Sequence, residues 1–135
     1  MKVVIIDGQG GKMGQMIIER IKSSSVPCEL TAVGTNSIAT SAMLKAGAQF
    51  GATGENPIIV ASRNADVIIG PIGIISADSL LGEITPTMAM AIGQSSAKKL
   101  LLPINLCNNI IVGAGSLPMA KLIAETVDEL AKIIK

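Results

Sequence analysis

A turn of closely spaced glycines near the N-terminus is the clearest chemical feature of the sequence. The apolar run Val3-Val4-Ile5-Ile6 ends at Asp7-Gly8-Gln9-Gly10-Gly11-Lys12-Met13-Gly14, and we call residues 8–14 the glycine turn. Glycines between a first strand and a first helix permit a tight turn and let backbone N–H groups approach an anion. The turn therefore predicts a site for a phosphate-bearing ligand, bound by Asp7, Gly8, Gln9, Gly10, Gly11, Lys12 and Gly14. The alternatives are a structural turn without a ligand and, for Lys12, a solvated surface lysine.

Polar residues that follow later strands are expected at the same edge of the sheet. They are Thr35, Asn36, Gly70, Pro71, Gly73 and Asn105. In a doubly wound sheet, ligands bind beyond the carboxyl ends of the strands, where the strand order reverses. These neutral groups suit binding and orientation better than acid–base chemistry, and no catalytic residue is assigned. Each Asn or Thr can alternatively serve as a helix cap or a turn residue.

The end of the second predicted strand bears on the choice of nucleotide. It ends Val33-Gly34-Thr35-Asn36, without the Asp or Glu that binds ribose hydroxyls in many NAD-binding domains. NAD is therefore disfavoured, and NADP gains only partly, because no Arg is nearby and Lys45 is poorly placed. The spacing G-x-G-x-x-x-G of the glycine turn occurs in some NADP-binding proteins. The expected cofactor is NADP or another nucleotide.

Carboxylates near this site leave several roles open. Asp7 can accept hydrogen bonds from the N–H groups of the glycine turn, coordinate a Mg²⁺ shared with a phosphate, or accept a proton. Asp78 and Glu83 are expected to be solvated loop charges, with contact to a ligand as the alternative. The chain has no His and two distant cysteines, Cys28 and Cys107, so no zinc site is expected.

Strand-like and helix-like segments alternate along the chain. Strands are predicted at residues 3–6, 30–33, 67–70 and 100–102, with a possible fifth at 110–112. Helices are predicted at residues 12–24, from the cap Asn36 to the stop Gly47, at 57–63 after the cap Asn56, from Thr85 to about Gly93, and after Ser116. This order predicts an α/β fold: a single doubly wound, Rossmann-like domain over residues 1–135, with a mostly parallel sheet and helices on both faces.

Composition restricts the partners. Of the 135 residues, 49% are hydrophobic and 16% are charged, which fits strands buried on both faces and leaves a homodimer possible. The net charge of +1, without a basic stripe, argues against a nucleic-acid partner. No apolar run approaches the roughly 18 residues of a membrane span, so no membrane role is expected. Isolated thiols and the lack of a signal-like N-terminus predict a cytoplasmic protein.

Two resemblances add to these expectations. The motif Gly-Gln-Gly-Gly-Lys-Met-Gly resembles the cofactor loop of dihydrodipicolinate reductase, G-x-G-G-R-M-G, over about the first twenty residues, which implies cofactor-loop geometry. Over nearly the whole chain, the sequence resembles a family of small bacterial proteins known as a domain of unknown function. The segments that carry this likeness are Ile6-Asp7-Gly8-Gln9-Gly10-Gly11, Gly34-Thr35-Asn36, Met43-Leu44-Lys45-Ala46-Gly47-Ala48, Gly51-Ala52-Thr53-Gly54-Glu55-Asn56 and Gly70-Pro71-Ile72-Gly73-Ile74. This resemblance implies the fold and a cytoplasmic location, and no activity.

The sequence therefore favours a protein that binds a nucleotide or a phosphorylated small molecule, as a sensor or accessory subunit. The alternatives are an NADP-linked oxidoreductase or a Mg²⁺-dependent phosphate-handling enzyme, completed by a dimer partner, and a homo-oligomeric scaffold.

Overall fold

The computed structural model describes residues 1–104, 106 and 108–135. The strands are β1 (Lys2–Asp7), β2 (Glu29–Gly34), β3 (Phe50–Thr53), β4 (Val67–Pro71) and β5 (Lys98–Leu102). The helices are α1 (Lys12–Ser23), α2 (Ser37–Ala46), α3 (Glu55–Asn64), α4 (Pro86–Gln94) and α5 (Met119–Ile134), with a 3-10 helix, η1 (Ile72–Ile75), directly after β4. The strands form one sheet in the order β3-β2-β1-β4-β5, and every neighbouring pair is parallel. The expected doubly wound α/β fold is thus confirmed.

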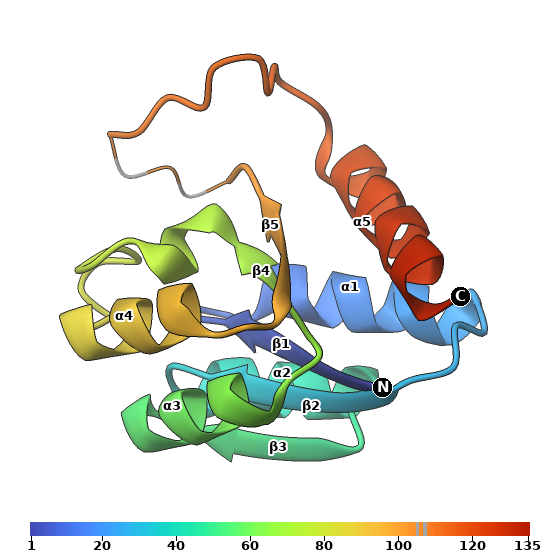
Figure 1. Cartoon of the computed structure of the whole chain (residues 1–135), viewed down its shortest axis with the longest axis horizontal. Helices are drawn as coiled ribbons and strands as arrows, with labels where there is room; N and C mark the ends of the chain where they lie inside the picture. Colours follow the sequence, from blue (N-terminus) through green and yellow to red (C-terminus); the bar gives the residue numbers. More distant parts are fainter. Residues whose placement is uncertain (105, 107) are drawn as a thin grey trace.

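The side chains of β1, the central strand, point alternately to the two faces of the sheet, so the core has two layers. In β1, Val3 and Ile5 face a core shared with α1, α2 and α5, whereas Val4 and Ile6 face a core shared with α3, η1 and α4. Figure 1 shows these helices on the two sides of the sheet. Because both faces of β1 are covered, its β-branched residues form one continuous apolar run.

The order of the strands reverses at β1, in the middle of the sheet. From β1 the chain moves outward to β2 and β3, then returns across the sheet to β4 and moves outward again to β5. Asp7 pairs with Gly34, so β1 and β2 end side by side, and β4 ends next to them on the other side of β1. Ligands of parallel sheets bind at this reversal. The glycine turn follows directly from β1 and lies there.

Three sequence-based expectations are corrected. The strand β3 was not predicted, because Phe50-Gly51-Ala52-Thr53 is a partly exposed edge strand without alternation. The predicted strand at residues 110–112 is absent from the described structure. Its residues lie in the long connection between β5 and α5, where Ile110 is 87% exposed and Val112 is 93% exposed.

The third correction concerns the start of α3. Gly54, rather than Asn56, occupies the N-cap position, and the helix begins at Glu55. Asn56 and Pro57 lie within its first turn, a position that suits proline because its missing N–H needs no partner there.

Within the described residues, no helix is both long and apolar enough to cross a membrane.

Candidate functional site

The glycine turn is shaped by close contact between α1 and its neighbours. Gly11 is the N-cap of α1, with φ of 74°, and its N–H donates to the carbonyl oxygen of Gly8 at 3.0 Å. A Cβ at Gly11 would lie 2.7 Å from Cα of Ala39 in α2. A Cβ at Gly14 would meet the side chain of Met43 in α2 and Cβ of Asp7. Both glycines are therefore required by packing, whether or not a ligand binds.

Gly10 is different, because no contact among the described residues requires a glycine there. It is exposed, its φ lies outside the left-handed region, and an added Cβ would meet nothing within 4 Å beyond its chain neighbours. Gly8, by contrast, is buried, and an added Cβ would lie 2.6 Å from both Glu83 Oε1 and Thr35 Oγ1. The open space of the turn is thus at Gly10.

Asp7 lies beneath the glycine turn and is bound by it. Its side chain is 5% exposed, and its two carboxylate oxygens accept the backbone N–H groups of Gly8 and Gly14, each at 2.8 Å. Burial raises the pKa of Asp7 above 3.8, the hydrogen bonds from Gly14 and Gly8 offset part of that rise, and the charge of Glu83 adds to it. Of the three roles that the sequence left open, the structure shows the first.

Other N–H groups at the start of α1 remain available. Within the described chain, those of Gly10, Lys12 and Met13 have no hydrogen-bond acceptor. Such groups at a helix N-terminus bind anions, since they need partners and carry the positive end of the helix dipole. The exposed side chain of Lys12 lies in the same turn.

Glu83 lies in the expected loop, but it is not the solvated charge favoured from the sequence. Its Oε1 accepts hydrogen bonds from the backbone N–H of Gln9 at 2.7 Å, the hydroxyl of Thr35 at 2.5 Å and the amide of Asn36 at 3.3 Å. Burial alone would raise the pKa of Glu83, but these three hydrogen bonds outweigh it and the net effect is a lowered pKa. Glu83 is therefore a fixed, ionised acceptor at the glycine turn rather than a freely solvated charge. Asp78 is exposed, as expected.

The segment that carries Glu83, residues 76–84, folds back over the turn. Asp78, Leu80 and Leu81 adopt left-handed backbone conformations, with φ of 64°, 56° and 56°. The N–H of Asp78 donates to the carbonyl of Ile84 at 2.7 Å, and the side chain of Leu80 is 2% exposed. Left-handed residues with side chains are costly, so they persist where surrounding contacts enforce them. Leu80 and Ile84 are buried and supply those contacts. Because they hold the backbone of this segment, they also fix the position of Glu83 between them.

Asn36 joins the site to the fold. Its Oδ1 accepts the N–H of Ala39 and caps α2, and its amide donates to the carbonyl oxygen of Gln9, both at 2.9 Å. Thr35 is tied to the end of β1, because its N–H donates to the carbonyl oxygen of Asp7 at 3.1 Å. Asn36 therefore serves both as a helix cap and as part of the site.

The remaining predicted residues lie apart from the hydrogen bonds of Glu83. Gly70 and Pro71 end β4 and are buried; a Cβ at Gly70 would lie 2.5 Å from the carbonyl oxygen of Ile6, which is a packing requirement. Gly73 lies in η1, where its carbonyl oxygen accepts a hydrogen bond from the Ser79 hydroxyl. Asn105 lies outside the described residues. The structure thus brings together Asp7, Gly8, Gln9, Thr35 and Asn36, with Gly10 and Lys12 at the exposed side of the same turn.

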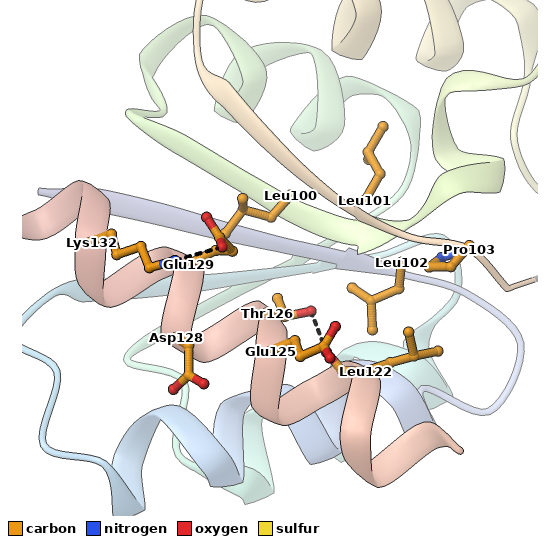
Figure 2. Close-up of a pocket in the computed structure, with 10 residues that line it drawn as sticks. All are labelled: Leu100, Leu101, Leu102, Pro103, Leu122, Glu125, Thr126, Asp128, Glu129 and Lys132. Carbon is orange, nitrogen blue, oxygen red and sulfur yellow. Dashed lines mark hydrogen bonds and ion pairs between the residues drawn. The ribbon is translucent and has the colours of Figure 1, made fainter. Parts of the chain in front are cut away.

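A separate hollow of about 370 Å³ lies between β5 and α5. Figure 2 shows leucines of β5 on one side of it and polar side chains of α5 on the other. Three of its polar side chains interact within α5: Thr126 donates to the carbonyl oxygen of Leu122 at 2.7 Å, and Lys132 pairs with Glu129 at 3.0 Å. The hollow shares no residue with the glycine turn.

Among the described residues, no group of three or more His, Cys, Asp or Glu is placed to hold a metal ion.

Comparisons with known proteins concern the family and the fold. No curated protein gave a match. Among solved structures, the chain is similar to a dodecameric FMN-dependent Ubix-like decarboxylase from Escherichia coli O157:H7, with 12% identity, a TM-score of 0.44, and coverage of 98% of this chain and 94% of that chain. A likeness this distant says nothing about ligand, reaction or assembly here. The chain belongs to the family described as a domain of unknown function (DUF3842), which matches residues 2–135.

Proposed function

We propose that this protein binds a nucleotide or another phosphorylated small molecule at the glycine turn. The observation that carries the proposal is a set of backbone N–H groups at the start of α1, those of Gly10, Lys12 and Met13, which have no acceptor within the described chain. Beside them, a backbone N–H of Gln9, the Thr35 hydroxyl and the Asn36 amide donate to one carboxylate oxygen of Glu83 and hold it at the turn.

The place for the phosphate is next to these groups. The N–H groups of Gly10, Lys12 and Met13, unpaired among the described residues, lie at the N-terminus of α1, where phosphates bind in sheets of this strand order. The absence of a side chain at Gly10, which no internal contact requires, supports close approach of a ligand to the backbone.

Two acids near the turn, Asp7 and Glu83, link ligand binding to proton binding. Asp7 and Glu83 both carry negative charge that opposes an anionic ligand, while Lys12 offers a positive one. Burial already raises the pKa of Asp7, so a bound phosphate would raise it further and favour its protonation. Binding of an anion would then be accompanied by proton uptake.

We place the protein among binding proteins, as a sensor or accessory subunit. The groups around the turn other than the two acids and the Lys12 ammonium are backbone amides, a hydroxyl and carboxamides, which orient a ligand without exchanging protons at neutral pH. No observation favours one of the enzyme alternatives in particular.

A thermal-shift panel tests the proposal. Wild-type protein is heated with ADP, NAD⁺, NADP⁺, FMN or inorganic phosphate at millimolar concentration. A ligand present at a hundred times its Kd adds about 2.7 kcal/mol to the free energy of unfolding, which raises Tm by several degrees. We expect at least one nucleotide to do so in a saturable manner. If none of them shifts Tm, the proposal is wrong.

A further inference from the structure

Glu83 occupies the place of an acid that the second strand lacks. In sheets of this strand order, a carboxylate at the end of the second strand accepts hydrogen bonds from the ribose hydroxyls of the nucleotide. Here the residues after β2 are Thr35 and Asn36, which are neutral. Both donate a hydrogen bond to Glu83, as does Gln9 in the glycine turn. A carboxylate is thus present beside the end of β2, although residues 76–84 supply it.

The carboxylate retains capacity for a ligand. All three hydrogen bonds go to Oε1, and within the described chain Oε2 accepts none. An ionised carboxylate is an acceptor only, so a partner for Oε2 must be a donor. The side chain is partly exposed, which leaves Oε2 accessible to a ligand. The two adjacent hydroxyls of an unmodified ribose are donors of the required kind.

The same carboxylate opposes a phosphate at that position. A phosphate group on the ribose 2′-oxygen would add a charge of about −1.5 to −2 beside it. Within the described part of the chain, no Lys or Arg forms an ion pair with Glu83. Lys45 is in the last turn of α2, away from the Asn36 end of that helix. Within the described residues, no cation contacts Glu83 to neutralise a second anion there.

The carboxylate is also held in place before any ligand binds. Leu80 is buried and lies next to Gly8: a Cβ added at Gly8 would be 3.2 Å from the Leu80 side chain. The backbone N–H of Glu83 donates to the carbonyl oxygen of Leu80 at 3.1 Å. A preformed acceptor loses little freedom on binding, which favours the ligand that matches it.

We infer that Glu83 selects nucleotides with a free ribose 2′,3′-diol and rejects those with a 2′-phosphate. This inference rests on the proposed function and narrows it: NAD⁺ or an adenosine phosphate binds in preference to NADP⁺. This preference for NAD⁺ over NADP⁺ is opposite to the expectation from β2, whose missing acid disfavoured NAD and partly favoured NADP.

Isothermal titration of wild-type protein with two matched pairs tests the inference. NAD⁺ is compared with NADP⁺, and ADP with 2′-deoxy-ADP. We expect the first member of each pair to bind about tenfold or more tightly, the change expected when a hydrogen bond to a charged group is lost or replaced by repulsion. Equal affinities within each pair, or a preference for NADP⁺, would overturn the inference and leave the proposed function intact. If none of the four binds but FMN or inorganic phosphate raises Tm in the thermal-shift panel, the inference alone is overturned; if no ligand acts in either assay, the proposed function is contradicted.

Variants assign the preference to Glu83. In Glu83→Gln the side-chain oxygen still accepts hydrogen bonds, but the negative charge is gone, so we expect the discrimination against NADP⁺ to shrink by about tenfold. Asp78→Asn removes an equal charge from an exposed position of the same segment and should leave the preference unchanged. If Glu83→Gln retains the full preference, Glu83 does not determine it. Circular dichroism verifies that both variants are folded. If a variant does not fold, the titrations of the wild-type protein with the two ligand pairs still test the inference.

Discussion

Substitution of Gly10 separates ligand binding from folding. An added side chain there projects into open space, and the backbone φ suits any residue. We therefore expect Gly10→Val to change the free energy of unfolding by less than about 0.5 kcal/mol, as at other open surface positions. The isopropyl group would nevertheless fill the space through which a phosphate reaches the N–H groups of α1. A nucleotide should bind at least about a hundredfold more weakly, a loss of about 2.7 kcal/mol.

Gly11 provides the opposite case within the same turn. At φ of 74°, a residue with a Cβ costs about 1–2 kcal/mol. The added atom would also lie 2.7 Å from Cα of Ala39, and overpacking of this kind costs about 1–3 kcal/mol. Gly11→Ala should therefore lower the free energy of unfolding by about 2–5 kcal/mol.

The assay combines urea unfolding with isothermal titration, using the nucleotide that stabilises the wild type most. Gly93→Val is the control for Gly10→Val, because Gly93 lies near the end of α4 and also has open space around an added Cβ. We expect this control to bind as the wild type does. If Gly10→Val is folded and binds with wild-type affinity, the ligand does not approach the glycine turn and the reasoning is refuted.

Three other predictions concern the groups around the turn. Asn36→Asp keeps an oxygen to cap α2 but places a second carboxylate beside Glu83, so titration should show weaker nucleotide binding. Asn36→Ala also loses the cap and should cost about 0.5–2 kcal/mol in urea unfolding. Because the pKa of Asp7 is raised from 3.8, the folded state binds its proton more tightly than the unfolded state. The contribution of Asp7 to the free energy of unfolding should therefore fall as pH rises from 3.8 through the raised pKa. Nucleotide affinity should rise as pH falls. Unfolding and binding titrations across this pH range, with proton uptake measured in two buffers, test the direction of both changes. Leu80→Ala empties a buried position and should cost about 2–5 kcal/mol, seen as a lower Tm.

Local signals in the sequence predicted most of the elements. Asn36 caps α2, and Thr85 followed by Pro86 begins α4, because these residue types satisfy or avoid the free N–H groups of a helix start. The β-branched run of β1 and the glycines after it likewise predicted the turn from strand to helix. Phe50–Thr53 lacked such a signal, since pairing with β2 rather than its own pattern makes it a strand.

The role of Glu83 could not be predicted in the same way. It lies 48 residues from Thr35 in the sequence, and its position depends on left-handed backbone at Asp78, Leu80 and Leu81. Leucine seldom adopts that conformation, so no local pattern indicates it. β2 itself ends without an acid, whereas the fold supplies a carboxylate from a segment beyond β4.

Chemical shifts of the backbone amides test the central claim most directly. In a titration of ¹⁵N-labelled protein with ADP or NAD⁺, we predict saturable shifts for the amides of Gln9, Gly10, Lys12 and Met13 and for the side-chain amide of Asn36. Signals from residues around the hollow between β5 and α5, such as Leu102 and Glu125, should not move. Saturable shifts at that hollow with an unchanged glycine turn, or no shifts with either nucleotide, would contradict the account.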